Sequence, residues 1–235
     1  MDREMWNRQV PALANQFHVV RYDIRPFGAS SQVTTPYAPI DDLLRVIDRF
    51  GAKRAHLIGH SFGGNVALDF AMAHPDRVAS LALVGAAPTG STMPEEERKA
   101  AGAVFAAIKD GDDAIVRAWI AQPMWKVSVA RPEIVKELDA ITRRSLTVFR
   151  MTAPPFTPTP TMMDKLVSIK APTLIVVGDR DSAGVREAAG RLAAGIPGAV
   201  TQVVAGADHA LPIGWADELN AAVLRFLTAL PRDDR

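Results

Sequence analysis

The sequence predicts an α/β domain built on a doubly wound, mostly parallel sheet, with a helical lid inserted between two parts of the core. Short apolar runs typical of buried strands alternate with amphipathic helical patterns, and this alternation implies right-handed βαβ units. A serine flanked by glycines follows one of the apolar runs directly. The chain has 235 residues, of which 48% are hydrophobic, so it can bury one large core.

The strands of the sheet are expected where short apolar runs are bounded by turn residues. The run Val78–Gly85 is apolar throughout, which is typical of a strand covered on both faces. The expected strands are Phe17–Asp23, Ala55–Gly59, Val78–Gly85, Thr173–Gly178 and Ala199–Val204.

The helices of the core are expected where apolar residues recur at helical spacing between the strands. Ile40, Leu43 and Ile47 form such a stripe. Pro75 ends the helix that follows the glycine-flanked serine, near His74, because proline cannot continue a helix. The expected core helices are Ile40–Phe50, Gly63–His74, Gly184–Ile196 and Ile213–Leu230.

The stretch between residues 88 and 166 breaks this alternation. It contains helical patterns and then the proline-rich run Ala153–Pro160, which we interpret as a stiff return linker. We expect residues 1–87 and 167–235 to form the core, and residues 88–166 to form a helical lid over the carboxyl ends of the strands. An ordinary helical layer of the same core is the alternative. The expected helices here are Glu95–Lys109, Asp112–Ile120 and Pro132–Phe149.

Composition excludes several classes of function. Basic and acidic residues number 27 and 26, giving a net charge of +1 without a basic stripe, so nucleic acid is not an expected partner. The chain has no cysteine, hence no disulfide, thiol nucleophile or cysteine-based metal site. No apolar stretch reaches the roughly 18 residues of a membrane span, and the N-terminus lacks the apolar core of a signal peptide. We expect a cytoplasmic protein, and the oligomeric state is not predicted.

The pentapeptide Gly59–Gly63 is typical of a nucleophile elbow, in which a serine occupies a tight turn between a strand and a helix. The flanking glycines remove side chains that would collide where the strand and the helix meet. Ser61 is therefore expected to stand exposed at the carboxyl end of its strand. The following helix N-terminus favours negative charge there.

A serine hydroxyl needs a base, and the base needs an acid that orients it. In a doubly wound sheet, such groups converge only from loops after the strands' carboxyl ends. Asp179 and Asp181 follow the strand Thr173–Gly178, and His209 follows Ala199–Val204. We expect Asp181 to be the acid because it lies further past its strand, whereas Asp179 is expected to bond the local turn.

The other histidines are weaker candidates for the base. His18 and His56 lie in or at the start of expected strands. His74 ends a helix, where it favours the helix dipole. His60 adjoins the serine but should point away from its reacting face. A surface histidine in a loop remains the alternative interpretation of His209.

At this point the chain resembles the α/β-hydrolase superfamily, in its small lidded esterase, enol-lactonase and cofactor-free haloperoxidase branch. Arg21–Ser30 is similar to the Asp-x-Arg-Gly-x-Gly-x-Ser segment of that family, and Leu57–Gly64 matches its elbow. Ala73–Val78 matches its helix-to-strand turn, and Gly178–Asp181 its acid loop, whose fourth position is the catalytic acid. The serine at position 61 argues against relatives that use aspartate there, the dehalogenases and epoxide hydrolases.

The sequence departs from the family pattern in two places. Pro26 replaces a glycine of the first segment, which should change only the local turn. The family also places strands and a His-Gly loop before the helix that here includes Met5–Ala14, so we expect an N-terminally shortened member. The resemblance puts the missing central strand between Phe17–Asp23 and Ala55–Gly59. Either these two strands close up, another chain fills the gap, or the chain is the shortened product of a longer gene.

The same departure bears on catalysis. The resemblance implies an oxyanion hole made by the N–H of Phe62 and by a second donor from the missing loop. Losing one such donor typically lowers turnover by about 10²–10³, so weakened activity is expected.

The sequence thus predicts a serine hydrolase that cleaves small carboxylic esters or lactones through an acyl-enzyme, without metal or organic cofactor. The alternatives are C–C bond hydrolysis or peracid formation with the same triad, and a non-catalytic binding protein of the same fold. Phe27, Trp125 and Phe156 are candidate apolar walls of the substrate pocket, with ordinary core or lid packing as the alternative.

Overall fold

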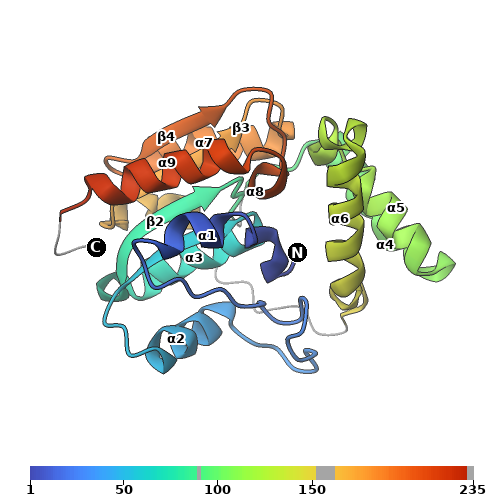
Figure 1. Ribbon diagram of the computed structural model, residues 1–235. Helices are drawn as coiled ribbons and strands as arrows, with labels where there is room; N and C mark the ends of the chain where they lie inside the picture. The colour runs from blue at the N-terminus through green and yellow to red at the C-terminus, as the bar shows by residue number, and fades with distance from the viewer. Residues whose placement is uncertain (89–90, 152–161, 232–235) are drawn as a thin grey trace.

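The computed structural model describes residues 1–88, 91–151 and 162–231. Its described residues form a parallel sheet in the order β1–β2–β3–β4 (Figure 1). The strands are β1 (Ala55–His60), β2 (Val78–Val84), β3 (Thr173–Gly178) and β4 (Val200–Val204). All residues of β2 and β3 are buried, which agrees with their continuously apolar sequences.

Helices cover both faces of the sheet, as the doubly wound prediction requires. The core on one face contains buried side chains of α2 (Pro39–Arg49), α3 (Phe62–Ala73) and α7 (Ala183–Gly195). The core on the other face contains those of α1 (Gln9–Ala14) and α9 (Ala216–Ala229). From Leu81 to Val84, successive residues of β2 enter the two cores alternately, because side chains alternate along a strand. The predicted fold class is confirmed.

The chain between β2 and β3 carries a helical insertion. Its helices are α4 (Glu95–Ala106), α5 (Asp112–Ile120) and α6 (Pro132–Arg144). Figure 1 shows them as a group on the side toward which the strand arrows point, next to the short helix α8 (Leu211–Gly214). Short 3₁₀ turns lie at Arg3–Trp6, Pro75–Arg77, Ala107–Asp110, Pro123–Trp125, Ser128–Ala130, Leu146–Arg150 and Met162–Ser168.

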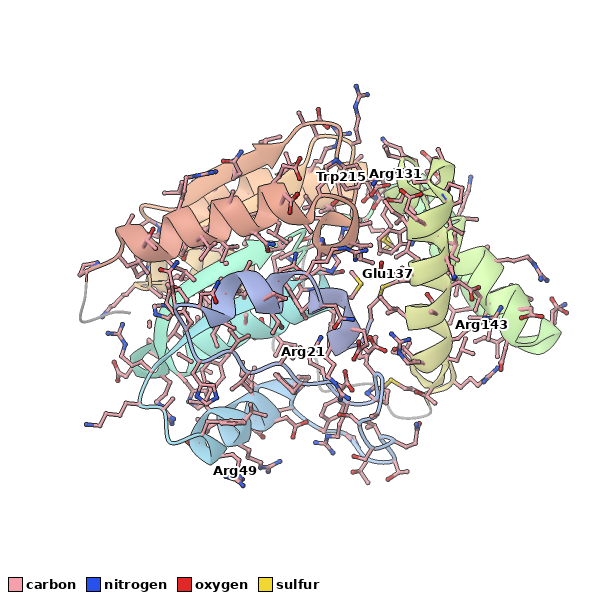
Figure 2. All side chains as sticks on the ribbon, in the orientation of Figure 1. Arg21, Arg49, Arg131, Glu137, Arg143 and Trp215 are labelled. Atoms are coloured by element: carbon pink, nitrogen blue, oxygen red, sulfur yellow. The ribbon has the colours of Figure 1, made fainter. Side chains whose placement is uncertain are left out.

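The insertion is joined to the core by apolar and polar contacts. A cluster of buried side chains combines Trp125, Ile134 and Leu138 of the insertion with Met5 and Ile213 of the core. An ion pair and a cation–π contact extend this seam at the surface. Arg8 pairs with Glu137 at 2.7 Å, and the Arg131 guanidinium lies 5.3 Å from the Trp215 ring centroid (Figure 2).

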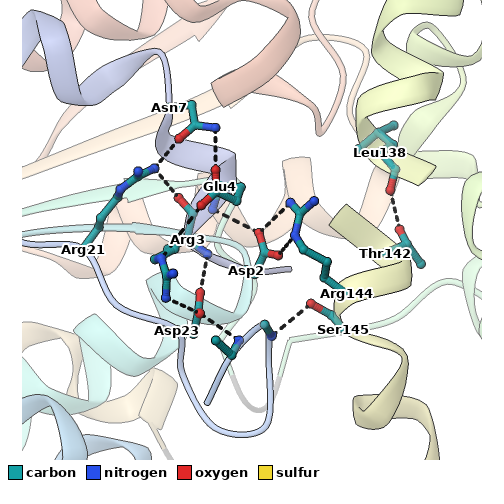
Figure 3. A network of polar contacts seen from close by, with 12 residues as sticks. Asp2, Arg3, Glu4, Asn7, Arg21, Asp23, Leu138, Thr142, Arg144 and Ser145 are labelled. Atoms are coloured by element: carbon teal, nitrogen blue, oxygen red, sulfur yellow. Dashed lines mark hydrogen bonds and ion pairs between the residues drawn. The ribbon is translucent and has the colours of Figure 1, made fainter. Parts of the chain in front are cut away.

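A polar network ties the N-terminal segment to the end of α6 (Figure 3). Asp2 accepts a hydrogen bond from the Arg144 guanidinium at 2.6 Å, and Asp23 accepts one from Arg3 at 2.7 Å. Both carboxylates are buried, so these pairs compensate the cost of removing their charges from water. Ser145 completes the network by accepting a hydrogen bond from the Gly28 N–H at 3.3 Å.

The prediction of a strand at Phe17–Asp23 is wrong. The segment belongs to no ladder, and β1 is an edge strand that pairs with β2 alone among the described residues. A strand requires a hydrogen-bonded neighbour about 4.8 Å away, whereas residues of this segment and of β1 line one cavity and share no ladder. The two segments have not closed up.

The helices expected at Met5–Ala14 and Glu95–Lys109 are shorter than predicted. The first is a 3₁₀ turn at Arg3–Trp6 followed by α1, and the second ends at Ala106 and continues as a 3₁₀ turn.

Two further helix predictions need correction. The predicted helix Ile213–Leu230 is divided into α8 and α9 at Trp215, whose φ of −135° and ψ of 45° are not helical. The predicted helix Pro132–Phe149 ends at Arg144, after which the chain continues as a 3₁₀ turn. No helix within the described ranges has the length and apolarity to cross a membrane.

Candidate active site

Ser61 occupies a strained turn between the end of β1 and the start of α3. Its φ is 52° and its ψ is −120°, and it is the only non-glycine residue with positive φ in the described chain. Its N–H donates to the Val84 carbonyl of the neighbouring strand at 2.8 Å, which fixes the turn to the sheet. A left-handed backbone costs a residue with a Cβ about 1–3 kcal/mol and often marks a functional site. The predicted nucleophile elbow is therefore present in its geometry.

The glycines around the turn have different roles. A Cβ on Gly59 would lie 2.3 Å from the Gly63 carbonyl oxygen, and one on Gly64 would lie 2.7 Å from Cβ of Ala86. A Cβ on Gly63 would meet its nearest neighbour at 3.9 Å, an ordinary contact. Crowding therefore requires glycine at positions 59 and 64. The prediction that a side chain at position 63 would also collide is wrong, because a Cβ has room there.

Asp181 and His209 form a buried pair beside the elbow. His209 Nδ1 lies 2.9 Å from Asp181 Oδ2, and both side chains are at most 3% exposed. The second carboxylate oxygen of Asp181 accepts the Ser182 N–H at 2.7 Å. Asp179 accepts the Gly206 N–H at 2.7 Å in the local turn instead. Of the two candidate acids, Asp181 is the one that reaches His209.

The surroundings of His209 favour a histidine that gains a proton readily. Burial alone lowers its pKa, but the charge and hydrogen bond of Asp181 and the charge of Asp208 oppose this, and the net pKa shift is upward. Because a carboxylate only accepts hydrogen bonds, Nδ1 must carry the proton in the pair. In the neutral imidazole, Nε2 is then the nitrogen free to accept a proton.

His60 is held in a different state. Burial and the nearby His209 lower its pKa well below the ordinary value, so it is neutral. Its Nε2 lies 2.8 Å from the carbonyl oxygen of His209 and must donate to it, because that oxygen only accepts. His60 thus supports the backbone of His209, in agreement with the expectation that it does not serve as the base.

A cavity of about 750 Å³ adjoins these groups. Ser61, Phe62 and His209 line it together with the predicted wall residues Phe27 and Trp125. The Phe27 ring lies 6.0 Å from that of Phe62, and the Trp125 ring lies 5.3 Å from that of His209. The third predicted wall residue, Phe156, lies outside the described residues. The cavity continues along β1, where Leu13, Leu43 and Leu57 line it.

One residue at the site was missed by the sequence argument. Asp208, directly before His209, is fully buried and accepts hydrogen bonds from the insertion at Val127 and Ser128. The available signal was a carboxylate directly adjacent to the predicted base, although aspartate is also a common turn residue. In the described parts of the chain, no group of three or more histidine, aspartate or glutamate side chains is placed to hold a metal ion.

Comparison with known proteins agrees with this geometry. Residues 1–222 match the sequence profile of the alpha/beta hydrolase family. The chain belongs to that family. A hydrolase by class, it is 29% identical to a putative carbamate hydrolase RutD of Caulobacter sp. (strain K31), over 95% of this chain and 85% of the relative.

Solved structures of other alpha/beta hydrolases share its fold. An enol-lactonase from Burkholderia xenovorans LB400 superposes with a TM-score of 0.79 at 26% identity, covering 97% of this chain and 87% of its own. A thermophilic esterase from Thermogutta terrifontis superposes with a TM-score of 0.82 at 25% identity, covering 97% of this hydrolase and 86% of its own chain.

Proposed function

We propose that this alpha/beta hydrolase is a serine hydrolase that cleaves small carboxylic esters or lactones through an acyl-enzyme. The observation that carries the proposal is His209, which is paired with the buried Asp181 at 2.9 Å and lines one cavity with Ser61 in its strained turn. Strand, loop and chain order all agree with a Ser–His–Asp triad. The similarity of this chain to an esterase and to an enol-lactonase supports the same reaction class.

Each group has one role in the proposed reaction. Nε2 of neutral His209 takes the proton of Ser61 as Oγ attacks the substrate carbonyl carbon. Asp181 holds the imidazole through Nδ1–H and stabilises its cationic form. The N–H of Phe62, the first residue of α3, has no acceptor within the helix and donates to the developing oxyanion. His209 then gives its proton to the leaving oxygen.

The second half of the reaction regenerates the serine. His209 takes a proton from a water molecule, and the resulting hydroxide attacks the acyl carbonyl. The tetrahedral intermediate collapses, the acid leaves, and the proton on His209 returns to Ser61.

The substrate class follows from the walls of the cavity. Aromatic rings of Phe27, Phe62 and Trp125 line it beside Ser61 and His209. Such walls favour an apolar, uncharged acyl or alcohol group. The similarity to a putative carbamate hydrolase adds carbamates to the carbonyl compounds that deserve testing. We propose that the insertion of α4–α6 acts as a lid over this site.

Labelling with a fluorophosphonate probe tests the nucleophile. Wild-type protein should be modified at Ser61, and Ser61→Ala should remain unlabelled. His209→Ala should lose labelling because the hydroxyl then has no base. A folded wild-type protein that resists the probe and cleaves no ester, lactone or carbamate would favour a non-catalytic binding protein. Product analysis with a diketone or with peroxide would reveal C–C hydrolysis or peracid formation.

A further inference from the structure

The Asp208 carboxylate is completely enclosed and completely hydrogen bonded. Its Oδ2 accepts the N–H groups of Val127 and Ser128 at 2.9 and 2.7 Å. Its Oδ1 accepts the Ser128 hydroxyl at 2.7 Å and the Ala210 N–H at 3.0 Å. An ionised carboxylate offers about four lone-pair sites, and each of them is used here. Three of the donors belong to the helical insertion, far from Asp208 in sequence.

The contact between the two segments is reciprocal. The His209 N–H donates to the Met124 carbonyl at 3.1 Å, so the insertion also holds the backbone of His209 directly. On the other side of the same residue, the His209 carbonyl accepts from His60 at 2.8 Å. Trp125, between these anchor points in sequence, packs its ring edgewise against the His209 imidazole at 5.3 Å.

We propose that Asp208 is a positioning residue that fastens the segment Met124–Ser128 of the insertion to the loop of His209, and thereby sets the orientation of the imidazole. The inference rests on the proposed function of His209 as the base. Asp208 does not line the cavity with Ser61, so it acts through His209 and through Trp125.

The carboxylate is suited to this task because only an anion accepts from so many donors at once. An asparagine would offer two acceptor sites, and its NH2 group would face an N–H donor in either orientation: Val127 and Ser128 on one side, or Ala210 on the other. That mismatch would weaken the attachment of the insertion to the loop of His209. Loss of the Ser128 hydroxyl alone removes one of the bonds and leaves the charge in place.

The charge itself gives a second readout. The ionisable groups around His209 are Asp181 after β3, His60 at the end of β1, Asp208 in its own loop, and the terminal amine of Met1. The insertion contributes Met124 and Trp125, which carry no charge. Because Asp208 raises the pKa of His209, its neutralisation should lower that pKa, and a loss of stability alone would not.

The test compares Asp208→Asn, Ser128→Ala and a matched control, Asp179→Asn, in the full chain. Asp179 is an exposed carboxylate of the neighbouring loop, where it accepts the Gly206 N–H and pairs with Arg180. Turnover of p-nitrophenyl acetate is measured per probe-reactive serine, which removes the effect of unfolded protein. The pKa of His209 is measured separately, from the pH dependence of its imidazole NMR signal.

Asp208→Asn should lower kcat/KM at least about tenfold per labelled site, with the loss mainly in kcat, and should lower the pKa of His209. Ser128→Ala, which loses one hydrogen bond, should lower kcat/KM by a factor of about five and leave that pKa unchanged. Asp179→Asn should match wild type in kcat/KM. Wild-type kcat/KM and an unchanged pKa of His209 in folded Asp208→Asn would refute the proposal.

Two further outcomes are decided by the same measurements. If Asp208→Asn does not fold, wild-type turnover per labelled site and unchanged imidazole signals in Ser128→Ala refute the positioning role. If the wild type is neither labelled nor active, the proposed function fails. The pKa and imidazole signals of His209 in the variants then still decide whether Asp208 positions it.

Discussion

Replacing Asp181 by asparagine removes the charge from the buried pair and keeps nearly the same shape. The asparagine oxygen can still accept the Ser182 N–H, as Asp181 Oδ1 does at 2.7 Å. Its amide nitrogen must then face His209 Nδ1, which Asp181 Oδ2 now approaches to 2.9 Å. An amide nitrogen only donates, so Nδ1 becomes the acceptor and the proton of the neutral imidazole moves to Nε2. His209 can then no longer take the proton of Ser61.

The magnitude follows from this change of tautomer. The same substitution in a serine protease triad lowers kcat by about 10⁴. Because both side chains are buried here, solvent cannot supply a substitute partner. We expect kcat to fall by about 10³–10⁴, which corresponds to about 4–5.5 kcal/mol of transition-state stabilisation.

The assay is p-nitrophenyl acetate turnover, normalised to folded protein by the urea unfolding curve. Asp179→Asn is the control, since it removes a carboxylate two residues away that bonds the Gly206 N–H. A folded Asp181→Asn enzyme that keeps more than about a tenth of wild-type kcat would refute the assigned role of the pair. A larger loss in the Asp179 variant would show that the wrong carboxylate was assigned.

The remaining predictions concern pH and packing. His209 must be neutral to act as the base, and its pKa is raised. We therefore expect kcat/KM to increase with pH, with the midpoint of the increase above the ordinary histidine pKa of about 6.5. A midpoint below about 6 in the pH profile of kcat/KM would contradict this. Gly59→Ala should lower the free energy of unfolding, measured by urea titration, by about 2 kcal/mol or more, because its Cβ would lie 2.3 Å from a backbone oxygen. Gly63→Ala should lower it by less than half as much, and equal losses in the two variants would refute the steric explanation. Burial raises the pKa of Asp69 to about 6, so the stability that protonated Asp69 contributes is present at low pH and is lost as pH rises through about 6. The free energy of unfolding of Asp69→Asn should therefore exceed that of wild type by up to roughly 3 kcal/mol at pH 8 and by little at pH 4. Equal urea unfolding midpoints of the two proteins at pH 8 would contradict this.

Local signals predicted most of the secondary structure correctly. The strand Thr173–Gly178 has the predicted bounds, and β1, β2 and β4 differ from prediction by one residue at an end. The residues of β2 and β3 are all buried, so burial favours the strand conformation there, whereas β4 is mostly exposed and was predicted from its β-branched residues. The same reasoning failed for Phe17–Asp23, whose sequence favours a strand but which has no neighbouring strand to bond.

The candidate site divides in a similar way. The Gly-x-Ser-x-Gly pattern predicted the elbow at Ser61, because a short motif with its flanking strand and helix defines a local backbone geometry. Spacing along the chain favoured Asp181 over Asp179 as the acid. The structure shows that Asp181 is the one of the two that contacts His209, with its Oδ2 2.9 Å from Nδ1. The role of Asp208 had no local signal beyond its charge, since its partners Val127 and Ser128 lie about 80 positions earlier.

The sequence by itself determined the alternation of strands and helices, the family and the identity of the elbow serine. Each of these depends on contacts between residues that are near one another along the chain. Only the tertiary structure decided which carboxylate contacts His209, which hydrogen bonds join the insertion to the loop of His209, and that residues 17–23 remain outside the sheet. These outcomes depend on distances and hydrogen bonds between segments that approach one another only after the two cores have packed, and periodicity carries no information about them.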